Sequence, residues 1–114
     1  MTAAPVHAQG LSTERLDELC RDPASEAWRE IGQWLCPAYI RGLIDSARLQ
    51  ALHVAGSVEG HRRLMQFCEP EHSSPRETID AVLHYIAEHP ESRSMPAART
   101  VYIALAAAWP CQAP

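Results

Sequence analysis

Four cysteines constrain the fold of this chain more than any other feature of its sequence. They are Cys20, Cys36, Cys68 and Cys111. The gaps between them are 15, 31 and 42 residues, whereas zinc sites usually bring cysteines together in close C-x-x-C pairs. An even number of cysteines without metal spacing, in a chain of 114 residues, indicates disulfide bonds and an oxidising compartment. We therefore expect one small cross-linked domain that holds no metal.

Two helices are predicted in the first half of the chain. The first is short and is capped by Ser12 or Thr13. The second begins after Ser25 and carries apolar residues on one face as far as Leu52. Because Pro37 lacks an amide donor and crowds the preceding turn, we expect it to kink or divide this helix. The apolar positions that define the two helices are Leu16, Leu19, Cys20, Trp28, Ile31, Leu35, Tyr39, Ile40, Leu43, Ile44 and Ala47.

The third predicted helix has the clearest start signal in the sequence. Ser74 as N-cap, Pro75 at the first helical position and Glu77 at the third form a capping box. Apolar residues then repeat with helical spacing until the helix ends before Pro90. The preceding stretch, residues 55–66, loses this periodicity and is predicted to be a loop with at most a turn or two of helix.

A fourth helix is predicted from about Met95 to Trp109, with Ser94 as its cap. It is apolar nearly all round. We therefore expect this helix either to lie at the centre of the domain or to bury its second side against another subunit. No segment shows the alternating pattern of a strand. The sequence therefore predicts an all-α fold, a compact four- to five-helix domain with two disulfides, over residues 11–114.

Four cysteines allow three disulfide connectivities. The sequential one fits the predicted helices best, because a Cys20–Cys36 bond would join the first helix to the second. A Cys68–Cys111 bond would then close the hairpin formed by the last two helices. In the chain-entropy model such bonds contribute roughly 3 to 4 kcal/mol each.

The first ten residues are not expected to belong to the fold. Val6-His7-Ala8 before Gln9 has the small-x-small form of a signal-peptidase site, although the apolar segment that should precede it is absent. We interpret residues 1–10 as the remnant of a signal peptide or a disordered N-terminus.

Composition argues against several classes of function. The net charge is −4 and all ten basic residues are arginines, which does not predict a nucleic-acid-binding face. No run of about 18 apolar residues could span a membrane. A cysteine nucleophile would need a paired base, and no local signature links a cysteine to His61, His72, His84 or His89. We therefore predict neither an enzyme nor a bound cofactor.

Pairs of residues one helical turn apart are interpreted as ordinary helix-surface pairs. His84 and Glu88 could form half of a metal site, but a solvated helix face is the interpretation we favour. Arg41 and Asp45 are expected to form an intrahelical ion pair. The large aromatic residues are expected in the core: Trp28, Trp34, Trp109, Tyr39 and Tyr102.

Charged stretches flank the third predicted helix at both ends. Such a stretch is usually a solvated face, and the alternative is a recognition loop for a basic partner. The candidate partner-binding residues are Glu69, Glu71 and His72 before the helix, and Glu88, His89, Glu91, Ser92 and Arg93 at and after its end.

Five pieces of the sequence carry a resemblance to a known family. In chain order they are Leu16, Leu19 and Cys20; Cys36, Tyr39, Ile40, Gly42 and Asp45; Phe67, Cys68 and Pro70; Tyr85, His89 and Pro90; and Pro110 and Cys111. Together they resemble the Rap/Tai immunity proteins, small secreted helical proteins of Gram-negative bacteria that neutralise peptidoglycan amidase effectors delivered by type VI secretion. Two departures are Pro37-Ala38, where the family has x-Gly, and Trp109, where it has phenylalanine.

The resemblance implies a periplasmic homodimer that holds itself against the active-site cleft of a secreted cell-wall amidase and has no chemistry of its own. A rigid loop on a cross-linked scaffold suits this role, because preorganisation limits the entropy cost of binding. We favour the segment 88–95 as that loop, with residues 69–73 as second choice. The alternative function is a small disulfide-bonded periplasmic stress chaperone without a toxin partner.

Overall fold

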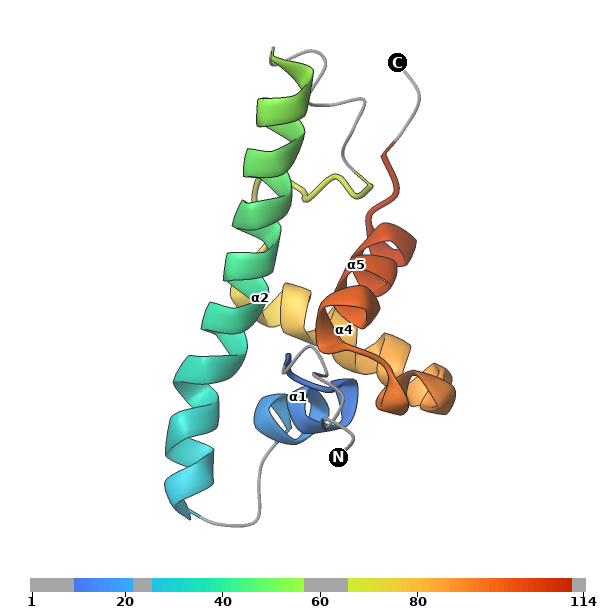
Figure 1. The fold of residues 1–114 in the computed structure, drawn as a ribbon. Coiled ribbons are helices and arrows are strands. Elements are labelled where there is room, and N and C mark those ends of the chain that lie inside the picture. The colour runs from blue at the N-terminus through green and yellow to red at the C-terminus, as the bar shows by residue number, and fades with distance from the viewer. Residues whose placement is uncertain (1–9, 22–25, 57–65, 112–114) are drawn as a thin grey trace, which may run out of the picture.

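The protein is all-α in the computed structural model, which describes residues 10–21, 26–56 and 66–111. Its elements are α1 (Thr13–Cys20), α2 (Glu26–Ala55), α4 (Pro75–Glu88), the 3-10 helix η1 (Pro90–Ser94) and α5 (Ala97–Ala108). Figure 1 shows α2 along one side of the molecule, with α1, α4 and α5 grouped together beside it. Over the described ranges there is no strand, only an isolated bridge between Ser12 and Pro96. The predicted fold class is confirmed.

Helix α2 runs for 30 residues without interruption, although Pro37 lies inside it. Of the two outcomes expected for Pro37, a kink or a division of the helix, the division does not occur. Proline removes one backbone hydrogen bond, but Cys36 and Ile40 on either side of it are buried in the core, so packing on both sides of Pro37 stabilises the continuous helix. The helix ends at Ala55. The next residue, Gly56, has a left-handed backbone (φ 68°) that suits glycine, and its amide donates to the carbonyl of Leu52 at 2.9 Å.

Both predicted disulfides are present. Cys20 bonds to Cys36 with a Cα–Cα distance of 5.2 Å, and Cys68 bonds to Cys111 at 4.9 Å. The first joins the end of α1 to α2. The second joins the segment before α4 to the end of α5, where the Cys68 amide also donates to the carbonyl of Trp109 at 2.8 Å.

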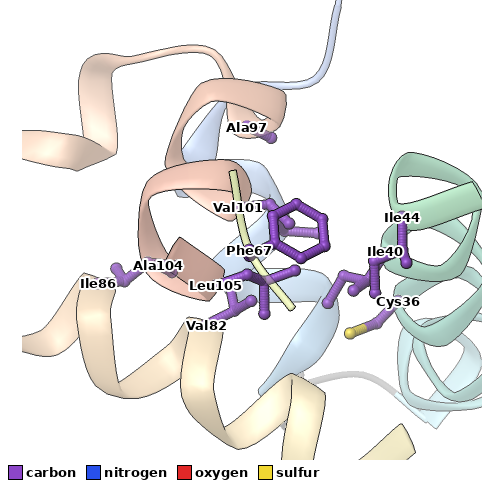
Figure 2. Close-up of a cluster of buried hydrophobic side chains, with 11 residues drawn as sticks. Cys36, Ile40, Ile44, Phe67, Val82, Ile86, Ala97, Val101, Ala104 and Leu105 are labelled. Atoms are coloured by element: carbon purple, nitrogen blue, oxygen red, sulfur yellow. The ribbon is translucent and has the colours of Figure 1, made fainter. Parts of the chain in front are cut away.

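The core lies between α2 and the helices that face it (Figure 2). The ring of Phe67, only 1% exposed, fills the space between Val101 on α5 and Ile40 and Ile44 on α2. Behind it, α4 and α5 pack together through Val82, Ile86, Ala104 and Leu105. Phe67 therefore joins α2 to the pair formed by α4 and α5.

The capping box predicted for α4 is confirmed in its first half, because the Ser74 hydroxyl accepts a hydrogen bond from the Glu77 amide at 3.1 Å. The predicted start of the last helix is wrong. Ser94 ends η1, and α5 begins only at Ala97 after Pro96. Because Met95 precedes a proline, its backbone is restricted to the extended region (φ −91°, ψ 160°) and cannot continue a helix.

The extended turn before α5 is tied to the start of α1. The carbonyl of Met95 accepts two hydrogen bonds from Thr13, one from the amide at 2.9 Å and one from the hydroxyl at 2.8 Å. The same hydroxyl lies 2.7 Å from that of Thr100, and both threonines are buried. The amide of Ala97 donates to the carbonyl of Leu11 at 2.8 Å. The short first helix thus closes the fold by fixing the start of the last one.

Two predicted core residues of α2 are instead on the surface. The side chain of Trp34 is 75% exposed and that of Leu35 is 47% exposed. The remaining predicted core aromatics of the described side chains, Trp109, Tyr39 and Tyr102, pack against the core, and burial next to Tyr102 raises the pKa of Tyr39 above its usual 10.0. The side chains of Trp28 and Ile31, and most of the predicted loop at 55–66, lie outside the described residues, as does nearly all of the proposed signal remnant.

Helix α5 is buried on one face only. Val101, Ala104 and Leu105 are in the core, whereas Ile103 is 37% exposed and Ala107 and Ala108 face solvent. None of the helices in the described part of the chain is both long enough and apolar enough to cross a membrane.

Candidate partner-binding site

The two charged stretches predicted from the sequence become loops at opposite ends of α4. We call residues 66–74 the leading loop, and the last residue of α4 with the segment that follows it, residues 88–96, the trailing loop. Because α4 has 14 residues and a helix rises 1.5 Å per residue, the loops are separated by about 20 Å of helix. They therefore form two separate surfaces, and the predicted residues do not converge on one site.

The leading loop turns its first carboxylate inward. The side chain of Glu69 is only 8% exposed, and its two oxygens accept hydrogen bonds from Arg41 (3.1 and 3.2 Å) and Arg48 (3.0 Å) on α2. Arg41 also pairs with Asp45 at 3.1 Å, as predicted. Glu71 and His72 remain exposed. Glu69 is thus part of the scaffold, and only the tip of this loop is exposed.

The trailing loop is anchored differently, through its arginine. Arg93 pairs with Asp17 of α1 at 3.1 Å, and the same carboxylate accepts from Arg21 at 2.6 Å. Asp17 is buried, with 5% of its side chain exposed. Ser92 is buried as well, and its hydroxyl has no hydrogen-bond partner among the described residues. The loop is therefore fixed to α1 through the side chain of Arg93, and Ser92 is buried beside this ion pair and not available to a partner.

Two carboxylates at the trailing loop face solvent. The side chains of Glu88 and Glu91 are 61% and 71% exposed. Each lies near a histidine: Glu88 is 3.2 Å from His84, and Glu91 is 3.1 Å from His89, whose ring stacks on Tyr85 with centroids 4.3 Å apart. A hydrogen bond from its own backbone amide, together with one from His89, lowers the pKa of Glu91 below its usual 4.5. The loop therefore presents a negative, ordered edge.

An apolar groove next to the leading loop was not predicted from the sequence. It encloses about 600 Å³ between α2 and the first half of α4. Its walls include Trp34, Pro37, Thr78 and Ile79, and Glu69 and Ser73 close one side. The sequence predicts Trp34 in the core, so it does not predict this groove. Helical periodicity alone does not reveal which apolar residues of a long helix lack a packing partner.

Metal-binding clusters are not found in the part of the chain that the structure describes. No group of three or more histidine, cysteine, aspartate or glutamate side chains there could hold a metal ion. His84 and Glu88 form an exposed pair one turn apart, as the solvated-face interpretation predicted.

The fold and these surfaces define a class: a small helical domain, cross-linked by two disulfides, that presents anchored acidic loops. The chain belongs to the family of Rap1a immunity proteins, whose model matches residues 12–111. No curated protein and no solved structure shows a significant match to it. The protein is therefore an immunity protein directed against a secreted effector, a family that is not generally catalytic. Family and disulfides are consistent with an exported protein.

Proposed function

We propose that this protein acts in the periplasm, where it binds a type VI secreted peptidoglycan amidase and occludes the active site of that enzyme with the trailing loop. The observation that carries the proposal is the contrast within that loop. The side chain of Arg93 and the carbonyl of Met95 tie the loop to α1, while Glu88 and Glu91 extend into solvent. The loop is thus ordered before binding and charged on its free edge.

Both properties suit inhibition by occlusion. A preorganised loop loses little conformational entropy when it enters a cleft, so more of the contact energy appears as affinity. Exposed carboxylates on its edge accelerate encounter with a positively charged cleft rim and select against other partners. No chemistry is required of the immunity protein itself.

The oxidised cysteines support the proposed location, because disulfides of this kind persist in the periplasm and not in the bacterial cytosol. The homodimer implied by the resemblance is also part of the proposal. The chaperone alternative has less support, since the family match concerns immunity.

A charge-reversal experiment tests the role of the trailing loop. The Glu88→Arg/Glu91→Arg variant should bind a purified type VI peptidoglycan amidase from the same genome at least about tenfold more weakly than the natural chain, because attraction at the loop edge becomes repulsion. Calorimetry measures the affinity and a muropeptide-cleavage assay measures inhibition. The melting temperature should stay nearly constant, since both side chains are exposed.

The matched control is Glu71→Arg/Asp80→Arg, which makes the same change in charge at exposed positions of the leading loop and α4. We expect it to leave affinity unchanged. A loss of affinity in the control and not in the test variant would assign binding to the leading loop instead. Absence of binding and of inhibition by the natural chain would contradict the amidase as partner.

A further inference from the structure

The apolar groove beside the leading loop has the size of a small-molecule binding site. Its volume of about 600 Å³ falls within the range of about 300 to 1,000 Å³ that is typical of ligand pockets. One wall is formed by α2, and the other by the leading loop and the first half of α4. No residue of the trailing loop lines it. The groove is therefore a surface of its own, apart from the loop proposed to occlude the amidase.

The walls of the groove are mostly apolar and are held in place by the core. Ile40 and Ile44 of α2 line its inner part and are only 2% and 1% exposed. Ile79 adds apolar surface from α4. Trp34 stands at the rim, where 75% of it is open to solvent. Because aromatic molecules stack on an indole ring and bury apolar surface as they do so, these walls favour a ligand with aromatic rings.

The two charged residues that line the groove neutralise each other. The Arg41 guanidinium donates to the two oxygens of Glu69 at 3.2 and 3.1 Å, and to Asp45 at 3.1 Å. Glu69 also accepts a hydrogen bond from Arg48 at 3.0 Å. A charged ligand would lose its hydration and would find no unpaired opposite charge among the side chains that line the groove. The groove is therefore matched in charge to an uncharged ligand.

Each wall of the groove also offers a hydrogen-bond acceptor. Pro37 has no amide hydrogen, so it cannot donate to the carbonyl of Gln33 four positions earlier in α2, and both residues line the groove. On the α4 side, the hydroxyl of Thr78 donates to the carbonyl of Ser74 at 3.2 Å, which leaves the hydroxyl oxygen to accept from a ligand. The groove thus suits a ligand that carries a hydrogen-bond donor.

Pro37 and Ala38 both line the groove, and they are the two residues of α2 at which the chain departs from the Rap/Tai pattern. Pro37 leaves the carbonyl of Gln33 without its helical donor. The short side chain of Ala38, at an exposed position, leaves the space beside it open. The groove therefore depends on two residues that the family pattern does not share.

We propose that the groove between α2 and α4 binds a small uncharged aromatic molecule that carries a hydrogen-bond donor, with an aromatic ring stacked on Trp34. This inference goes beyond the proposed function and does not depend on it, because the residues expected to contact the amidase do not line the groove.

A pair of matched probes tests the chemistry of the site. N-phenyl-1-naphthylamine is uncharged and joins two aromatic ring systems through one N–H group. We expect it to bind the oxidised natural chain saturably, one molecule per chain, with a rise in probe fluorescence and quenching of tryptophan emission. The matched probe, 8-anilino-1-naphthalenesulfonate, has the same rings and N–H group with an added sulfonate. It should bind at least about tenfold more weakly, because its charge must be desolvated without a free partner. Equal or tighter binding of the sulfonate would overturn the inference.

Three variants test the location. Ala38→Phe fills the groove from an exposed position, and Trp34→Ala removes the stacking surface, so each should raise the dissociation constant of N-phenyl-1-naphthylamine about tenfold or more. Leu49→Ala is the matched control, because Leu49 is an exposed apolar residue of the same helix (68%) that does not line the groove. It should change the constant less than about twofold. Circular dichroism should show the same helix content in all three.

Pro37→Ala tests the acceptor on α2, because it restores an amide that can donate to the carbonyl of Gln33. Binding of N-phenyl-1-naphthylamine should weaken by about threefold to tenfold, the effect of one lost hydrogen bond. Binding of 1-phenylnaphthalene, which lacks the N–H group, should stay the same. An equal effect on both compounds, or no effect on either, would rule out a donor as part of the ligand.

Two further results would overturn the inference. One is the absence of saturable binding up to the solubility limit of N-phenyl-1-naphthylamine, or binding that Ala38→Phe and Trp34→Ala leave intact. The other is probe binding that disappears as the protein concentration rises, in step with self-association measured by sedimentation, since a second copy of the chain would then cover the groove. None of these results bears on inhibition of the amidase, which is measured separately.

Discussion

The two loops at the ends of α4 have similar sequences and opposite constructions. Each carries glutamates and a histidine within a few residues of the helix. The leading loop is attached through its carboxylate, because Glu69 is drawn onto Arg41 and Arg48. The trailing loop is attached through its arginine, because Arg93 is drawn onto Asp17. The lesson is that the residue used for attachment determines which charge remains for a partner.

Removing the attachment of the leading loop at Cys68 should have the largest effect on stability. Cys68→Ala/Cys111→Ala opens a loop with a sequence separation of 43 residues, whereas Cys20→Ala/Cys36→Ala opens one of 16. The chain-entropy model gives losses of about 4 and about 3 kcal/mol. Urea unfolding of both variants measures the difference. A smaller loss for the Cys68–Cys111 pair would show that strain, and not loop length, controls stability here.

Removing the attachment of the trailing loop should affect both stability and binding. Asp17→Asn leaves Arg93 and Arg21 without their carboxylate. Because both arginines are nearly half exposed, we expect a loss of about 1 kcal/mol in the free energy of unfolding. The affinity for the amidase should fall with it, because the loop becomes less ordered before binding.

The control for Asp17→Asn is Glu69→Gln, which weakens the corresponding attachment of the leading loop. Since Arg41 and Arg48 are nearly half exposed, solvent screening limits its cost to about 1 kcal/mol. It should leave affinity for the amidase unchanged. If both substitutions weakened binding equally, the contrast between the loops would have no functional meaning.

The smallest expected effect concerns the titration of Glu91. Its pKa is lowered in the folded protein, first by the hydrogen bond from its own backbone and then by the one from His89. The stabilisation from these two contacts is therefore present above pH 4.5 and is lost as the pH falls through the folded pKa. His89→Gln should raise this pKa only part of the way to 4.5, because the backbone hydrogen bond is the larger cause. Side-chain carbon NMR follows the titration. Full recovery of the ordinary value would assign the shift to the histidine alone.

Local sequence signals predicted much of the scaffold. The hydroxyl of Ser74 and the position of Pro75 specify the start of α4 without help from the rest of the chain. The sequential disulfide pairing followed from placing the cysteines at helix ends. The late start of α5 could also have been predicted, because Met95 precedes a proline.

The surfaces could not be predicted in the same way, because they depend on contacts between distant segments. Glu69 and Glu91 look alike in the sequence, and only the position of α2 beside the leading loop distinguishes them. Trp34 lies on an apolar stripe with helical spacing, yet the core does not extend to that part of α2. Periodicity identifies an apolar face but not the element that covers it.

Hydrogen exchange of the complex with the type VI amidase tests the central claim most directly. We predict that binding slows exchange of the amides in residues 88–95, while residues 69–73 exchange as in the free protein. Slowed exchange at residues 69–73 and along the adjoining groove, with residues 88–95 unchanged, would contradict the account.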